Sequence, residues 1–136
     1  MRPGETTVAS HGHVHWNELN THDAERAKAF YGNAMGWSFE RMDMMDGAPP
    51  YWVAKAGDAT IGGIFTMSGP DFEGVPDHWL THFDVQDIDA KLDEARGNGA
   101  TVLREPWDMP GVGRIAIVRD PGGAVTGWIQ PSEPVR

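Results

Sequence analysis

The sequence predicts an α+β fold in which two βαβββ modules form an open, curved sheet around a central cavity. The order of one strand, one helix and three strands occurs twice, and a shift of 64 residues brings Trp16 onto Leu80 and Asp23 onto Asp87. A stretch rich in glycine and proline, residues 68–77, separates the halves and indicates a linker. Because a small sheet cannot bury both of its faces alone, we expect the two halves to share one cavity.

The first module is expected to cover residues 13–67, after a flexible lead of residues 1–12. Asp23 suits the start of a helix because its carboxylate can accept hydrogen bonds from first-turn amides, and Gly36 suits its left-handed end. The helix carries one apolar stripe, formed by Ala27, Phe30, Tyr31 and Ala34. The four strands are predicted at residues 13–20, 37–42, 51–55 and 59–67.

Two adjacent glycines, Gly62 and Gly63, interrupt the last of these strands. Glycine weakens a strand, so its presence there indicates a bulge or the close approach of another group.

The second module is expected to cover residues 78–131, followed by a tail of residues 132–136. Asp87 is the predicted cap of its helix, and Asn98-Gly99 the predicted end. Four strands are expected, at residues 79–85, 101–105, 114–119 and 124–130, with a loop over residues 106–113.

Composition narrows the class of protein. The net charge is −9 and only 11 residues are Lys or Arg, which argues against binding to nucleic acid. No apolar run approaches the ~18 residues of a membrane span, and residues 1–10 do not resemble a signal peptide. We therefore expect a cytoplasmic protein without a membrane partner. The absence of cysteine excludes disulfides and thiolate metal sites.

Several short motifs recur in order in the two halves, and through them the chain resembles the vicinal-oxygen-chelate superfamily of glyoxalase I, bleomycin-resistance proteins and extradiol dioxygenases. Trp16, Gly63-Ile64 and Gly113-Arg114 are further similar to a glyoxalase-like subgroup without an assigned substrate. The resemblance covers residues 13–131 and implies paired modules, usually associated as a homodimer. The motifs that carry the resemblance are residues 29–31 (AFY), 35–37 (MGW), 98–100 (NGA) and 120–124 (DPGGA).

The resemblance also implies a divalent metal held by one side chain from the first and one from the fourth strand of each module. The matching positions are Trp16, Gly63, Leu80 and Gly127, with Gly62 as the alternative to Gly63 if the alignment slips by one residue. None of these side chains can coordinate a metal. We therefore expect no cofactor, with a divalent metal only at a non-standard site, and we expect these positions to line a ligand cavity.

The alternating histidines, Trp16 and Arg114 each allow two interpretations, one functional and one structural. His11, His13 and His15 alternate along a strand and could hold a metal, although their face is the one on which the helix should pack. Trp16 either stacks on a planar ligand or fills the space of the missing metal. Arg114 either binds a carboxylate or phosphate in the cavity or forms a surface ion pair.

Glu18 and His82 are the candidate catalytic residues, because strand alternation places each on the cavity face, close to a ligand position of the family. Together they could form an acid–base pair or, with Asn20 and Asp84, hold a displaced metal. The alternative is a hydrogen-bonded pair that satisfies itself in a polar cavity mouth.

Two functions follow from these observations. The first is metal-independent binding of a small aromatic or polyketide-like molecule, as in bleomycin-resistance proteins. The second is a glyoxalase-like lyase or isomerase that uses Glu18 and His82. Dioxygenase activity is not expected, because the family's metal ligands are missing. A dimerising module without a small ligand is the third alternative.

Overall fold

The computed structural model describes residues 10–44 and 46–132. The chain divides into two compact units, which we call the first unit (residues 16–80) and the second unit (residues up to 15 together with those from 81 onward). Eight strands, two α-helices and one short 3-10 helix form within the described ranges. The α+β class and the repeated βαβββ order are confirmed, whereas the shared cavity between modules stays a prediction.

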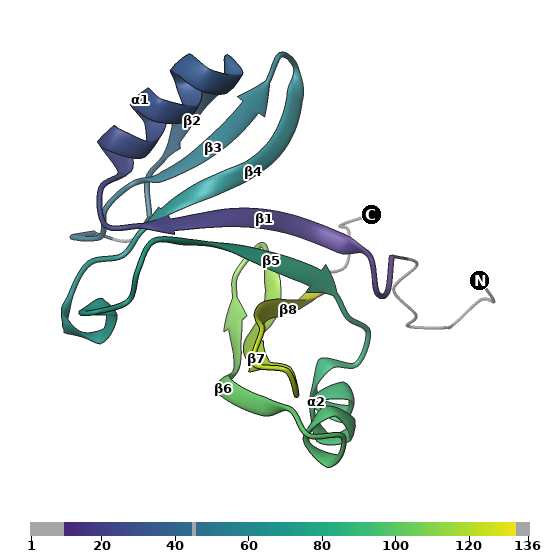
Figure 1. The fold of residues 1–136 in the computed structure, drawn as a ribbon. Helices are drawn as coiled ribbons and strands as arrows, with labels where there is room; N and C mark the ends of the chain where they lie inside the picture. Colours follow the sequence, from purple (N-terminus) through teal and green to yellow (C-terminus); the bar gives the residue numbers. More distant parts are fainter. Residues whose placement is uncertain (1–9, 45, 133–136) are drawn as a thin grey trace. The chain divides into compact units, whose positions relative to one another are not determined.

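The first unit is a four-stranded sheet with one helix. Its strands follow the order β2-β3-β4-β1, and β1 runs parallel to β4 with Glu18 opposite Gly63 (Figure 1). Its elements are β1 (Val14–Thr21), α1 (Ala24–Met35), β2 (Ser38–Met42), β3 (Tyr51–Ala56) and β4 (Ala59–Thr66).

The ends of α1 are set by the residues that the sequence indicated. The Asp23 carboxylate accepts a hydrogen bond from the Arg26 amide at 3.0 Å, and Gly36 ends the helix with a φ of 71°. The expected apolar stripe is only partly covered, because Ala27 and Tyr31 are half-buried whereas Phe30 and Ala34 are exposed. No residue of α1 is buried, and the side chain of Phe30 is 61% exposed.

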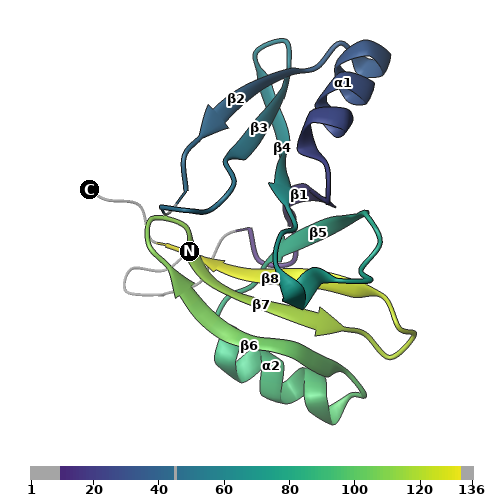
Figure 2. The same ribbon diagram turned by 90° about the vertical axis from the view of Figure 1, so that its left-hand side faces the viewer.

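The second unit repeats this plan, with the strand order β5-β8-β7-β6 and β5 parallel to β8 (Figure 2). Its elements are β5 (His78–Asp84), α2 (Ile88–Gly97), β6 (Thr101–Met109), β7 (Gly113–Arg119) and β8 (Val125–Pro131). The division between the units falls inside β1 and β5. The linker contains the 3-10 helix η1 (Pro70–Phe72).

Two local predictions for the second unit are wrong. The strand expected at residues 101–105 continues to Met109, because β6 is an edge strand that tolerates Pro106 and absorbs it with shifts of register. Asp87 does not cap α2 with its side chain, since its backbone is left-handed at a φ of 48°. The Ile88 amide instead donates to Gln130 Oε1 at 2.9 Å.

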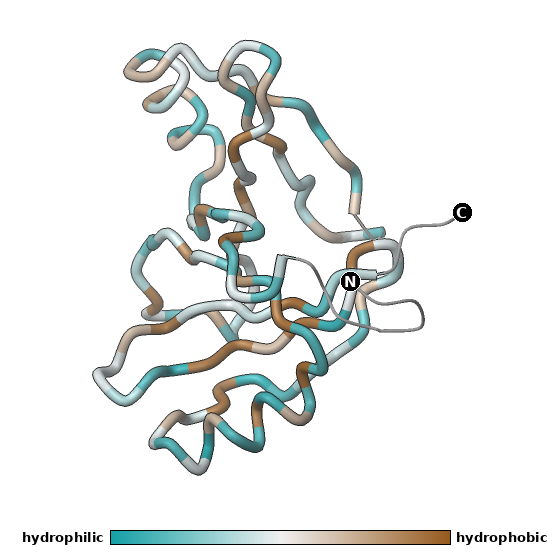
Figure 3. The backbone as a smooth tube through the Cα atoms, turned by 90° about the vertical axis from the view of Figure 1, so that its right-hand side faces the viewer, coloured by the Kyte–Doolittle hydropathy of each residue, from teal (hydrophilic) through white to brown (hydrophobic). Residues whose placement is uncertain are grey.

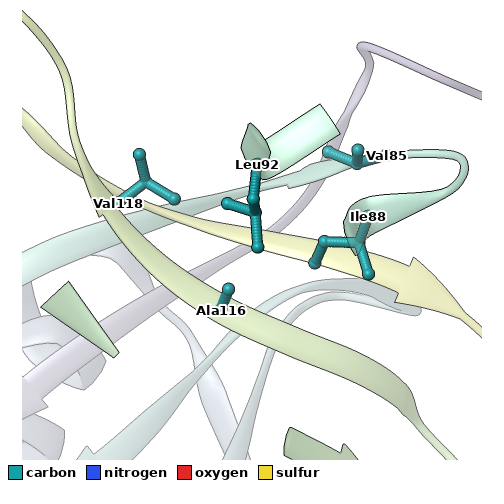
Figure 4. Close-up of a cluster of buried hydrophobic side chains, with 5 residues drawn as sticks. All are labelled: Val85, Ile88, Leu92, Ala116 and Val118. Atoms are coloured by element: carbon teal, nitrogen blue, oxygen red, sulfur yellow. The ribbon is translucent and has the colours of Figure 1, made fainter. Parts of the chain in front are cut away.

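The main apolar core lies in the second unit, between α2 and the sheet. Ile88 and Leu92 of α2 pack against Ala116 and Val118 of β7, and Val85, which directly follows β5, completes the cluster (Figure 4). Hydrophilic residues occupy much of both helices (Figure 3). Within the described residues, neither helix combines the length and apolar character needed to cross a membrane.

Candidate functional site

A chain of hydrogen bonds in the first unit joins three side chains across the sheet. The Trp16 indole Nε1 donates to the Tyr51 hydroxyl at 2.7 Å, and this hydroxyl donates to Glu18 Oε2 at 2.9 Å. We call these three residues the Glu18 relay. Trp16 and Glu18 lie two residues apart on one face of β1, whereas Tyr51 begins β3.

Gly63 allows Tyr51 to reach Glu18. Strand β4 lies between β3 and β1, so the Tyr51 ring must pass over it. A Cβ atom on Gly63 would overlap the Tyr51 hydroxyl, and one on Gly62 would overlap the backbone oxygen of Asn17. The glycine pair is therefore explained by close approach on both sides, as the sequence indicated.

The relay sets the protonation of its two acids. Burial raises the pKa of Glu18 to about 6, although the hydrogen bond from Tyr51 and the nearby His78 act in the opposite direction. Burial and the charge of Glu18 raise the pKa of Tyr51 above its ordinary value. Tyr51 therefore stays protonated and serves as the donor to the carboxylate.

Only one Glu18 oxygen is held by the relay. Tyr51 engages Oε2 at 2.9 Å. Glu18 itself is half-buried, so its carboxylate is shielded from water without being sealed off. A partly buried carboxylate with one oxygen fixed by a hydrogen bond and a pKa near 6 is suited to proton exchange.

His82 occupies the equivalent place in the second unit. It is paired with Gly127 of β8, as Glu18 is paired with Gly63, and only 8% of the residue is exposed. A Cβ atom on Gly127 would overlap the His82 ring. Glu18 and His82 belong to different units, and their action as a pair stays a prediction.

The positions implied for a family metal do not fit one. Trp16 and Leu80 provide no ligand atom, and rings lie where side chains on Gly63 and Gly127 would have to be. Within residues 10–44 and 46–132, no group of three His, Asp or Glu side chains could hold a metal ion.

The alternating histidines separate in the structure. The Nδ1 atom of His11 accepts from the Gln86 amide at 3.0 Å, while His15 Nδ1 lies 2.6 Å from the buried Asp84 carboxylate. The prediction that the helix covers this face is not supported for His15, which contacts Asp84 instead.

Arg114 forms the surface ion pairs that were one interpretation of the sequence. Its guanidinium makes two hydrogen bonds to Asp89, at 2.9 and 3.0 Å, and one to Asp108 at 3.3 Å. The hydrogen bond from Arg114 lowers the pKa of Asp89, which keeps that carboxylate charged. These contacts do not support a role for Arg114 in ligand binding.

Sequence reasoning missed Tyr51. The glycine pair in β4 indicated that some group approaches this strand, but the approaching ring starts twelve residues earlier in the chain and one strand away. Period-two alternation alone cannot show which ring crosses a strand.

The chain matches the family described as the Glyoxalase/Bleomycin resistance protein/Dioxygenase superfamily over residues 12–126. It is 40% identical over 129 residues to "Putative glyoxylase CFP32" of Mycobacterium bovis, covering 95% of this chain and 48% of that protein. It is 26% identical over 120 residues to the "Anthracycline biosynthesis protein DauV" of a Streptomyces species, covering 80% and 43%. The chain spans about half the length of the curated relatives it matches.

Solved structures share the fold at lower sequence identity. The methylmalonyl-CoA epimerase of Mycobacterium tuberculosis aligns with a TM-score of 0.63 and 14% identity, over 94% of this chain and 95% of that one. The Streptomyces coelicolor enzyme, solved as a variant with 2-nitronate-propionyl-CoA, aligns with a TM-score of 0.63 and 15% identity, over 92% and 100%. With a family match over most of its residues, the chain belongs to the Glyoxalase/Bleomycin resistance protein/Dioxygenase superfamily.

Proposed function

We propose that this protein binds a small carbonyl compound and acts as a metal-independent lyase or isomerase in which Glu18 accepts a proton from carbon. The observation that carries the proposal is the half-buried Glu18 carboxylate, held by Tyr51 at 2.9 Å and given a pKa of about 6. A general base is most effective when its pKa lies near the working pH.

The proposed step uses Glu18 Oε1. This oxygen takes a proton from the carbon next to a carbonyl group, and the electron pair of the C–H bond moves into the enolate. Return of the proton to carbon, or departure of a leaving group, completes an isomerisation or an elimination. Neither outcome needs an oxidant or a reductant.

Trp16 and Tyr51 support this step without exchanging the substrate proton. The indole holds the Tyr51 oxygen at 2.7 Å, and Tyr51 in turn fixes Oε2 of Glu18. Both aromatic rings also provide apolar area beside the carboxylate, which suits a small organic ligand. Similarity to proteins named for glyoxylase and epimerase activities agrees with this class of chemistry.

Three sequence predictions remain part of the proposal. His82 is proposed as the second acid–base group, because it occupies the place of Glu18 in the second unit. The homodimer and the cytoplasmic location also stay predictions.

Proton exchange in D₂O tests the proposed step. A panel of ketones and acyl thioesters is incubated with the protein, and loss of the α-proton signal is followed by ¹H NMR. We expect exchange with at least one compound, loss of that exchange in Glu18→Gln, and full exchange in the matched control Glu40→Gln, whose exposed carboxylate pairs with Lys55. A Glu18→Gln variant with undiminished exchange would overturn the proposal.

A titration that needs no substrate tests the basis of the proposal. Carboxyl ¹³C NMR, with Glu18→Gln used to assign the signal, should show Glu18 titrating near pH 6. Titration at the ordinary value of 4.5 would remove the physical reason for choosing this residue.

Sequestration of an aromatic molecule is the second candidate function, and the half-buried Trp16 beside Tyr51 favours it. A binder and an enzyme differ in the role of Glu18. Glu18→Gln should leave ligand affinity within about threefold in a pure binder, which corresponds to less than ~0.7 kcal/mol, and no substrate proton should exchange.

A further inference from the structure

The first unit also contains a pocket, which lies on the face of β1 opposite to that of Glu18. This open pocket of about 340 Å³ is lined by Leu19 and Thr21 of β1, by Ala27, Phe30 and Tyr31 of α1, and by Trp79 of β5. Strand alternation separates Leu19 and Thr21 from Glu18, so the pocket is not part of the Glu18 relay. Its volume falls in the range of small-molecule sites, ~300–1,000 Å³.

The aromatic wall of this pocket is ordered by its own contacts. Tyr31 stacks on Trp37 with ring centres 5.2 Å apart, and Trp79 meets Tyr31 edge-on at 5.6 Å. The Trp79 indole Nε1 donates to the Tyr31 hydroxyl at 3.1 Å, which links the polar groups of the two rings. Phe30 and Trp79 nevertheless remain 61% and 42% exposed. Their apolar surface is therefore available to a ligand.

Two carboxylates, those of Asp23 and Asp77, stand beside these rings in the pocket lining. Asp77 accepts hydrogen bonds from the Thr21 hydroxyl at 2.5 Å and the His22 amide at 3.0 Å. The Thr21 hydrogen bond lowers the pKa of Asp77, which keeps it charged.

The Arg26 guanidinium lies 3.6 Å from Asp23 and pairs with that carboxylate, although 85% of the Arg26 side chain is exposed. The negative charge that the pocket offers to a ligand is therefore that of Asp77. His78 directs its Nδ1 to the Pro76 carbonyl at 2.8 Å. The pocket thus has aromatic surface and negative charge together.

Two tryptophans outside the pocket, Trp52 and Trp107, each have a cationic side chain of the chain itself over the ring. Lys28 lies 3.1 Å from the ring centre of Trp52, and Arg104 lies 3.5 Å from that of Trp107. Among the described residues, no Lys or Arg lies over the rings of the pocket wall. Aromatic faces attract cations and repel anions, and nearby carboxylates strengthen that preference. The pocket therefore has the charge and the surface of a cation site that the chain does not itself fill.

We propose that this pocket binds an organic cation, with its ammonium group beside Asp77 and its apolar substituents on Phe30 and Trp79. A quaternary or substituted ammonium ion fits best, because its charge is spread over apolar groups that can contact the rings. The lining does not include Trp16, Glu18 or Tyr51, the residues of the Glu18 relay.

Choline and its uncharged isostere 3,3-dimethylbutan-1-ol provide the test. The indole N–H signal of Trp79, assigned with Trp79→Phe, is followed by NMR as each compound is added to the whole protein. We expect choline to shift this signal in the millimolar range and to bind about tenfold more tightly than the alcohol, a difference of ~1.4 kcal/mol.

Variants locate the binding. Phe30→Leu and Asp77→Asn should each weaken choline binding at least about threefold. Trp52→Phe is the matched control, because Lys28 already occupies that ring, and Glu18→Gln tests independence from the relay. Both should bind choline as the unchanged protein does.

Four outcomes would overturn the proposal. Three of them are equal affinity for choline and the alcohol, no shift by choline up to about 50 mM, and unchanged binding in Phe30→Leu. Phe30 is exposed, so the leucine variant should fold, and circular dichroism confirms this for each protein. Loss of choline binding in Glu18→Gln would show that the ligand sits at the relay.

Discussion

The two units share the same order of elements but differ in how much of each helix is buried against its sheet. In the second unit, α2 buries Ile88 and Leu92 against the sheet with 0% and 1% exposure, and a continuous apolar core results. In the first unit, α1 buries no residue. The repeat therefore conserves the order of elements while the packing beneath the helix differs.

The hydrogen-bonded side chains of the Glu18 relay are also not fully repeated in the second unit. The position 64 residues after Tyr51 is Ile115, a buried residue of the second unit, so the ring that crosses β4 has no aromatic counterpart in β7. Glu18 and His82 are equivalent, as are Gly63 and Gly127. We infer that the second unit contributes most of the packing stability, while the first unit carries a titratable site at the cost of stability.

The largest expected effect tests the packing side of this comparison. Leu92→Ala removes a fully buried side chain from the core of the second unit and should lower the free energy of unfolding by about 3 kcal/mol. Phe30→Ala, in the exposed helix of the first unit, should lower it by less than about 1 kcal/mol. Urea unfolding followed by circular dichroism measures both, and equal losses would contradict the comparison.

Much of the fold could be predicted from local chemistry. Asp23, Gly36 and the DPGG turn act within a few residues, so the sequence alone placed both helices and most strands. The second helix was placed correctly although its cap was not. Gln130, which receives the Ile88 amide, lies 42 residues away, and no local pattern indicates that contact.

The site was predictable only in part. Alternation along β1 put Trp16 and Glu18 on one face, and the structure joins them. Tyr51 was missed because the contact depends on the order of strands in the sheet. The open surface of α1 was also missed. A period of 3.6 shows that an apolar stripe exists, but not whether the sheet covers it.

Gly63→Ala tests the close approach in the first unit. The added methyl group would overlap the Tyr51 hydroxyl, so the ring must move and the relay should break. We expect a loss of about 2 kcal/mol in the free energy of unfolding and loss of the α-proton exchange proposed for Glu18. Gly36→Ala, at a left-handed helix end, is the control that should lower stability without affecting exchange.

Glu18→Gln tests whether the site reduces stability. The folded-state pKa of about 6 lies above the ordinary value of 4.5, so the folded protein holds this proton more tightly than the unfolded chain does. That contribution to stability is complete below pH 4.5 and is lost as the pH rises through about 6. Removing the charge should therefore stabilise the protein by about 2 kcal/mol at pH 8 and by nothing at pH 4.

Thermal unfolding of Glu18→Gln and of the unchanged protein across this pH range measures the difference. The same comparison for Glu40→Gln, whose carboxylate is exposed, should show no such gain. A Glu18→Gln variant less stable than the parent at pH 8 would show that the charged relay supports the fold, which is the opposite of the inferred division of roles.

Tyr51→Phe has the smallest expected effect and separates positioning from packing. The ring stays over Gly63, but the hydroxyl that donates to Glu18 and accepts from Trp16 is lost. Because that donation lowers the pKa of Glu18, the pKa should rise further, and the rising limb of the exchange rate should move to higher pH. The stability change should stay within about 1 kcal/mol. An unshifted profile would mean that Tyr51 only fills space beside the carboxylate.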